Sequence, residues 1–215
     1  MAPDPLTVIL IAGITGYLFH LWRLDLQAYR SGNEHAGSLP GAKNAPMRAS
    51  VIGGIGALIL LAAETGGEIA LDISAEQTDI TVLFLIPLIC AAFYEELIFR
   101  GMVVIPDRGR RAAILSALGG SLLFMVIHPY LWEWDLPEEA AFYALWEGTL
   151  SLSLTLKACY SSAFILFASL WFYTLRLYRR WNPEGSLIPC VVAHLVGNLG
   201  VFIIKLVQGH VTAWY

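Results

Sequence analysis

The feature that most limits how this chain can fold is a series of six long apolar runs that contain no lysine, arginine, aspartate or glutamate. They cover residues 6–22, 49–63, 80–94, 112–127, 158–175 and 186–204. A helix crosses a bilayer with about 20 apolar residues, or roughly 17 at the lower limit, and several runs reach that length with their neutral neighbours. The sequence therefore predicts an all-α fold, a polytopic helical membrane bundle of about six transmembrane helices.

The amino-acid composition also indicates a protein that lies in a lipid bilayer. Of the 215 residues, 57% are hydrophobic and 14% are charged, whereas soluble domains contain roughly 25% charged residues. A soluble protein of this size would need more polar side chains to cover its surface. We therefore expect a single membrane domain over residues 1–215 that lies in the lipid bilayer and binds no nucleic acid.

Basic and acidic residues alternate between the connections that join the runs. The first, third and fifth connections hold ten of the thirteen basic residues: Arg23, Arg30, Lys43, Arg48, Arg108, Arg110, Arg111, Arg176, Arg179 and Arg180. The second and fourth are acidic: Glu68, Asp72, Glu76, Asp79, Glu133, Asp135, Glu138 and Glu139. Because cytoplasmic loops are rich in lysine and arginine, we expect the basic connections inside and both termini outside.

The segment 132–157 has two interpretations. It mixes acidic residues with Phe142, Tyr143, Leu145 and Trp146, which predicts a short helix at the outer interface, where aromatic side chains settle. It could instead form the first part of a long fifth helix. Depending on how this segment folds, the total number of helices could be seven or eight.

Three ionisable residues interrupt the third apolar region in "FYEELIFRG", residues 93–101. Glu95, Glu96 and Arg100 oppose insertion by roughly 8 to 10 kcal/mol near the bilayer centre, about as much as the surrounding apolar residues favour it. They must therefore face the interior of the bundle. Glu96 and Arg100 are four residues apart and can form an ion pair, whereas Glu95 lies about 100° round the helix and is left to act as a general base. The alternative is a purely structural network of all three.

Two further polar sites lie in apolar runs. In "FMVIH" the ring of Phe124 can pack beside His128, which could otherwise be a simple interfacial histidine. In "HLVGN" His194 and Asn198 share a helix face and could stabilise an oxyanion, or merely clasp two helices together. If the third and fourth helices run antiparallel, their lengths leave Glu95 and His128 at depths that differ by roughly 6 Å.

The three motifs, in this order, resemble the signatures of the CPBP family, the CAAX-processing and bacteriocin-processing intramembrane endopeptidases, also called the ABI family. That family has two glutamates with an arginine four residues after the second, a phenylalanine four before a histidine, and a histidine four before an asparagine. The family-like core is expected at residues 80–208, whereas the N-terminal helices within residues 1–70 match no family pattern.

The resemblance implies a glutamic intramembrane protease without a cofactor. Glu95 would activate water, His128 would position it, and His194 and Asn198 would form the oxyanion hole. The ion pair described above would set the local structure. The substrate would be a membrane-anchored or prenylated polypeptide, cleaved near its terminus, and the enzyme would be an integral multi-pass protein of the bacterial cell (inner) membrane.

Three alternatives stay open. Glu95, His128 and His194 could supply three zinc ligands, although the sequence has no HExxH motif and its three cysteines are not spaced as ligands. A proton-coupled transporter also places ionisable groups in the bilayer, but it usually carries internal repeats, and none is seen here. A non-catalytic membrane scaffold would keep the same fold. The sequence does not indicate an oligomeric state.

Overall fold

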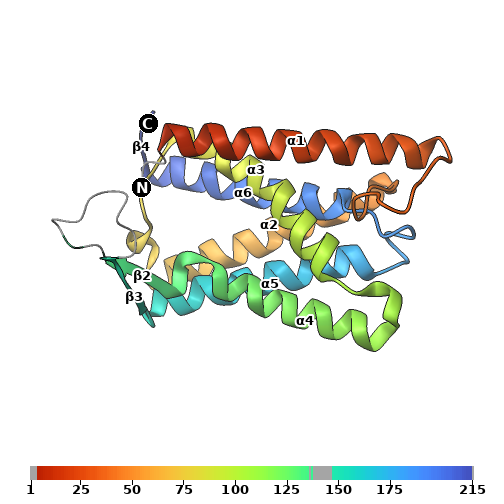
Figure 1. Ribbon diagram of the computed structural model, residues 1–215. Helices are drawn as coiled ribbons and strands as arrows, with labels where there is room; N and C mark the ends of the chain where they lie inside the picture. The colour runs from red at the N-terminus through yellow and green to blue at the C-terminus, as the bar shows by residue number, and fades with distance from the viewer. Residues whose placement is uncertain (1–3, 136, 138–146, 215) are drawn as a thin grey trace.

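The computed structural model describes residues 4–135, 137 and 147–214, in which six long helices pack side by side (Figure 1). They are α1 (Pro5–Arg30), α2 (Met47–Ala70), α3 (Leu85–Glu96), α4 (Arg110–Ile127), α5 (Leu156–Leu177) and α6 (Ile188–Gln208). A 3₁₀ turn, η2 (Val82–Phe84), precedes α3, and a π-helical segment, η3 (Leu97–Val103), continues it. Within the described residues, six helical segments are long and apolar enough to cross a membrane, which confirms the predicted fold class.

Local sequence signals set several helix ends. The carboxylate of Asp4 accepts a hydrogen bond from the backbone N–H of Thr7 at 2.9 Å and caps α1, and the hydroxyl of Thr155 does the same for the N–H of Ala158 in α5 at 3.1 Å. Such caps satisfy N–H groups that lack partners in the first turn. At the C-terminal end of α6, Gly209 has a φ of +85°, a left-handed conformation that glycine adopts without strain.

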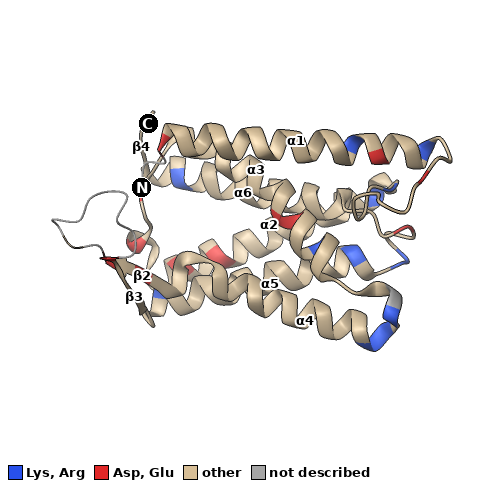
Figure 2. Cartoon of the chain, in the orientation of Figure 1, with Lys and Arg blue, Asp and Glu red and all other residues tan. Residues whose placement is uncertain are grey.

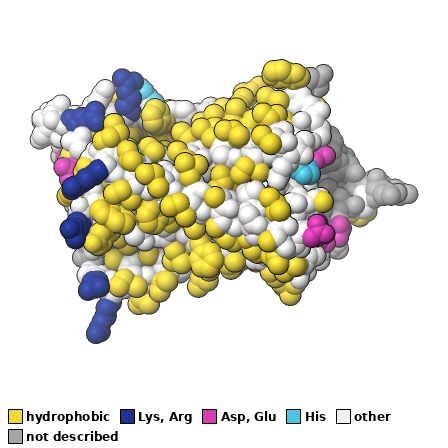
Figure 3. All heavy atoms as spheres, turned by 180° about the vertical axis from the view of Figure 1, so that it is seen from behind, with side chains coloured by type: hydrophobic (Ala, Val, Ile, Leu, Met, Phe, Trp, Pro, Cys, Tyr) yellow, Lys and Arg dark blue, Asp and Glu magenta, His cyan; other side chains and the backbone are white. Residues whose placement is uncertain are grey.

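Charged residues gather at the two ends of the bundle. Figure 2 shows lysine and arginine mainly at one end of the helices, whereas aspartate and glutamate lie at the end with both termini, within the bundle and beside the basic residues. The reverse face in Figure 3 shows a broad hydrophobic surface between a basic end and an acidic end. The position of the basic end is the one expected from the connecting sequences.

Short strands lie at the outer end, where the sequence analysis expected helix. Strand β1 (Ile80–Thr81) pairs in parallel with β4 (Val211–Ala213), so the third span begins at Val82 and not at residue 80. Strand β2 (Trp132–Asp135) pairs antiparallel with β3 (Thr149–Leu152), and α5 begins only at Leu156. The interpretation of 132–157 as the first part of a long fifth helix is therefore wrong, because the two arms of the segment pair as strands and α5 begins after them. The short interfacial helix was inferred from Phe142, Tyr143, Leu145 and Trp146, which lie outside the described residues.

The remaining turns are η1 (Ser74–Glu76), η4 (Pro106–Arg108) and η5 (Pro129–Leu131). Helix α6 packs against α2 and α3, α4 packs against α5, and α1 packs against α3. A Cβ atom at Gly53 of α2 would lie 2.9 Å from the carbonyl oxygen of Pro189 in α6, so this glycine permits the close approach of the two backbones. As a result α6 is held in the bundle beside α3, which carries the glutamates.

Candidate active site

An ion pair that is fully buried lies at the centre of the candidate site. Nη1 of Arg100 donates to Oε1 of Glu96 at 3.1 Å, and neither side chain has any exposed surface. Nη2 of Arg100 donates to Oγ of Ser169 at 2.5 Å, and that hydroxyl donates to Ser121 at 3.0 Å. The pair predicted from the four-residue spacing is thus confirmed, and hydroxyls from α4 and α5 complete it. Buried charges require such partners because they lose their hydration.

The helix that carries this pair changes its winding after Glu96, where the segment η3 begins. In the π-helical segment η3 the backbone bonds span five residues, a pattern often found at functional sites. Two carbonyls in this segment accept hydrogen bonds from α5: the hydroxyl of Tyr173 donates to Phe99 at 2.8 Å, and Nε of Arg176 donates to Arg100 at 3.0 Å. Side chains of α5 therefore stabilise the unusual turn that directs the Arg100 side chain inward.

His194 joins α6 to both glutamates. Its Nδ1 donates to Oε1 of Glu96 at 2.9 Å, and its Nε2 lies 3.8 Å from Oε2 of Glu95. The ring of Phe172 stacks on the imidazole with centroids 5.2 Å apart. Because the Glu96 carboxylate is an acceptor paired with Arg100, Nδ1 carries the hydrogen and Nε2 is the nitrogen turned toward Glu95.

Glu95 differs from its neighbour Glu96 in its surroundings. Its Oε2 has no hydrogen-bond partner among the described residues, and 19% of its side chain is exposed. Oε2 of Glu96 also lacks a partner, but that side chain is fully buried and its Oε1 already accepts from two donors. Oε2 of Glu95 is itself buried, but of the two side chains only that of Glu95 has an exposed part.

His128 directly follows α4, and its ring folds back over the last turn of that helix. Nδ1 of His128 donates to the carbonyl oxygen of Phe124 at 2.6 Å, and the two ring centroids are 4.4 Å apart. The expected packing of Phe124 on His128 is confirmed. The bond to the Phe124 carbonyl holds the imidazole against the last turn of α4.

The Phe124 ring also lies 6.3 Å from the ring of His194, so one aromatic ring contacts both imidazoles. His194 in turn lies 3.8 Å from Oε2 of Glu95. The structure therefore brings together the glutamate and the two histidines that lie on three different spans.

Asn198 lies one turn after His194 on α6. Its Nδ2 donates to the carbonyl oxygen of Leu88 in α3 at 2.8 Å. One of its two N–H groups thus serves the helix clasp that the sequence left open. Within the described residues, the second N–H and the side-chain oxygen form no hydrogen bond with the other candidate groups.

A second group of charged side chains, which we call the outer cluster, was missed by the sequence analysis. It consists of Glu64 and Glu68 of α2, Lys157 of α5 and Gln77. Glu68 was expected in an outer loop, but it lies inside α2, is 4% exposed, and forms an ion pair with Lys157. Gln77 donates to its other oxygen at 2.8 Å. The four-residue spacing of Glu64 and Glu68, just after an apolar run, was the available signal that both lie on one helix face.

The zinc alternative finds no support in this arrangement. In the described parts of the chain, no three histidine, cysteine, aspartate or glutamate side chains are placed to hold one metal ion.

Comparison with known proteins adds to this geometry. Residues 77–200, more than half of the chain, match the model of a family described as type II CAAX prenyl endopeptidase Rce1-like. The match includes all three motifs and α3 to the middle of α6. No curated protein and no solved structure matches the chain. The chain therefore belongs to the Rce1-like family of type II CAAX prenyl endopeptidases.

Proposed function

We propose that this CAAX-type intramembrane protease hydrolyses a peptide bond near the terminus of a membrane-anchored or prenylated polypeptide, with Glu95 as the general base. The observation that supports this role is the carboxylate oxygen Oε2 of Glu95, which lacks a hydrogen-bond partner among the described groups and lies 3.8 Å from Nε2 of His194. A carboxylate with a free lone pair beside an imidazole can accept a proton from water.

His128 and Glu95 would hold the attacking water between them. Because Nδ1 of His128 donates to the Phe124 carbonyl, Nε2 keeps its lone pair and accepts one hydrogen of the water. Glu95 accepts the other hydrogen. The oxygen lone pair is then free to attack the carbonyl carbon of the scissile bond, and the proton taken by Glu95 passes to the leaving amine.

His194 and Asn198 would stabilise the tetrahedral intermediate. Nε2 of His194 faces the site and would donate to the oxyanion when it carries a proton, and the second N–H of Asn198 would provide another donor. Glu96 would not react, because Arg100 and His194 already occupy its Oε1. It would orient the imidazole instead, as the carboxylate partner of a functional histidine commonly does.

The cell membrane of a bacterium is the proposed location. The six apolar spans and the charge separation between the two ends support a membrane with a cytoplasmic face.

The test compares purified Glu95→Gln with a Glu64→Gln control in lipid vesicles. Membrane-tethered prenylated peptides would be added, and cleavage followed by mass spectrometry. We expect Glu95→Gln to lower the rate by about 10²–10⁴-fold, as for loss of a general base, whereas Glu64→Gln in the outer cluster keeps most of it. Equal rates in the wild type and Glu95→Gln would disprove the proposed base, and proton-driven uptake without cleavage would indicate a transporter.

A further inference from the structure

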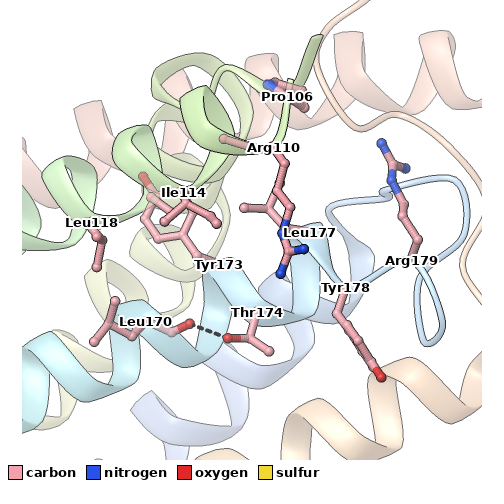
Figure 4. A pocket seen from close by; sticks show the side chains of 12 residues that line it. Pro106, Arg110, Ile114, Leu118, Leu170, Tyr173, Thr174, Leu177, Tyr178 and Arg179 are labelled. Carbon is pink, nitrogen blue, oxygen red and sulfur yellow. Dashed lines mark hydrogen bonds between the residues drawn. The ribbon is translucent and has the colours of Figure 1, made fainter. Parts of the chain in front are cut away.

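A cavity of about 490 Å³ opens between α4 and α5 near the basic end of the bundle. Its walls are mostly apolar and include Ala113, Ile114 and Leu118 of α4 and Leu170 and Leu177 of α5. Figure 4 shows Ile114 and Leu118 on one side of the cleft and Leu170 and Leu177 on the other. The volume falls within the roughly 300–1,000 Å³ of small-molecule sites, and the cavity is separate from the candidate active site.

The packing of α4 and α5 explains why the cleft is there. At its deep end the Tyr173 hydroxyl occupies the space above Gly120, where a Cβ atom would lie 2.1 Å from it. Nearer the basic end the α4 side of the cleft carries the small residue Ala113. The hydroxyl of Thr174 donates to the Leu170 carbonyl of its own helix at 2.8 Å (Figure 4). It therefore offers little polarity to the cleft.

Two arginines and a tyrosine stand at the basic end of this cleft. Arg110 is the first residue of α4, and Tyr178 and Arg179 directly follow α5. Arg179 donates from Nη1 to the carbonyl of Pro183 at 2.9 Å. Among the carboxylates that the structure describes, none forms an ion pair with Arg110 or Arg179.

The position in the bilayer selects the ligand chemistry. An apolar cleft that opens at two guanidinium groups fits a molecule with a hydrocarbon chain and an anionic head. Guanidinium groups bind phosphate oxygens with paired hydrogen bonds. By the positive-inside rule this end is cytoplasmic, and anionic phospholipids are concentrated in that leaflet, where basic pockets between helices bind their head groups.

We propose that the cleft between α4 and α5 is a binding site for one anionic phospholipid. Its acyl chain lies against Ala113, Ile114 and Leu177, and its phosphate binds Arg110 and Arg179. The deep end of the cleft is Tyr173, whose ring is 4.8 Å from Cζ of Arg100 and whose hydroxyl donates to η3. A bound lipid would therefore stabilise the pair of helices that supports the buried ion pair.

The experiment titrates the detergent-purified protein with phosphatidylglycerol or phosphatidylcholine of identical acyl chains and counts bound lipids by native mass spectrometry. The groove variant is Arg110→Gln/Arg179→Gln. The matched control is Arg111→Gln/Arg180→Gln, which removes two exposed arginines from the adjacent positions and changes the net charge equally. A third variant, Ala113→Trp, fills the cleft and keeps both arginines. Circular dichroism confirms that each variant is helical.

We expect the wild type and the control to bind one phosphatidylglycerol about tenfold more tightly than phosphatidylcholine. The groove variant should lose this preference, and Ala113→Trp should lose the bound lipid. Saturation should also raise the melting temperature of the wild type, because a ligand that binds the folded state stabilises it.

Three results would overturn the proposal. The first is equal affinity for the two lipids in the wild type, and the second is an equal loss of preference in the control variant. The third is stoichiometric displacement of the lipid by a prenylated peptide, which would assign the cleft to the substrate. Competition by millimolar inorganic phosphate without an acyl chain would count against the apolar part of the site. None of these results depends on the identity of the catalytic base.

Discussion

Two pairs of glutamates lie inside the helical bundle, and their surroundings differ. Glu95 and Glu96 of α3 face an arginine of the same chain segment, an imidazole of α6 and several aromatic rings. The outer cluster on α2 instead pairs Glu68 with Lys157 and Gln77. Among the described histidines, none bonds to Glu64 or Glu68.

The comparison teaches that an intramembrane carboxylate is not by itself an active site. In the outer cluster the oxygens of Glu68 have an ammonium and an amide as partners, so the cluster ties α2 to α5 and to the loop that holds Gln77. In the candidate active site one carboxylate takes up the positive charge, and this leaves its neighbour with an oxygen for water. The adjacent position of two glutamates allows this division, because they point about 100° apart.

Substitution of Arg100 should cause the largest loss of folding stability among the residues of the two clusters. Arg100→Met leaves Glu96 buried and without its charged partner, and breaking such a pair costs about 3–5 kcal/mol. Unfolding in mixed micelles with increasing sodium dodecyl sulfate would measure this loss. Arg100→Lys, which keeps the charge but not the two-pronged hydrogen bonding, should lose less, and an unchanged unfolding curve for Arg100→Met would contradict the central role of the pair.

A smaller effect is expected at the hydroxyls around Arg100. Ser169→Ala removes the acceptor of the Nη2 hydrogen bond and should cost about 1.5–3 kcal/mol, the range for hydrogen bonds to charged groups. Ser162 of the same helix is a matched control, since it is buried and its hydroxyl has no partner among the described groups. Ser162→Ala should leave stability unchanged or raise it, and equal losses in both variants would show that the arginine contact contributes nothing.

The outer cluster should give the smallest effect. The side chain of Lys157 is 14% exposed and the side chain of Glu68 alone is 6% exposed, so this ion pair is intermediate between surface and buried pairs. Lys157→Met should therefore lower the free energy of unfolding by about 1–2 kcal/mol. A second substitution, Glu68→Gln, should recover part of this loss by removing the unpaired charge. Peptide cleavage at a temperature where both variants stay folded should be close to that of the wild type. Loss of cleavage comparable to that of Glu95→Gln would mean that the two clusters form one functional unit.

Particular residues show how far the sequence could be interpreted. The spacing of Glu96 and Arg100 predicted their ion pair, and that of Phe124 and His128 predicted the ring contact, because both are interactions between neighbouring turns of one helix. The early start expected for the fifth helix failed for the opposite reason. The two strands alternate apolar and polar residues, which was an available strand signal, but their register depends on pairing between Trp132 and Leu152, which are far apart in sequence.

The outer cluster shows a second limit. Glu68 was counted with the loop because acidic residues follow it, whereas Lys157 and Gln77 shield it within α2. Hydropathy along the sequence assigns each charged residue a cost as if its side chain faced lipid or water. It cannot include a partner that comes from another helix, so the end of α2 was predicted too early.

The sequence by itself determined that the chain is a membrane protein, how many apolar spans it has and at which end its basic residues gather. It also determined the contacts between side chains four residues apart on one helix. These follow from hydropathy and from 3.6 residues per turn, which act over one or two turns of chain. Only the tertiary structure decided that His194 bonds to Glu96 while its other nitrogen faces Glu95, that the Phe124 ring lies against both His128 and His194, and that α4 and α5 leave a cleft beside two arginines. Those outcomes depend on how closely two helices approach each other. Small residues such as Gly53 and Gly120 permit a close approach, but the approach itself depends on both helices and cannot be inferred from the sequence of one.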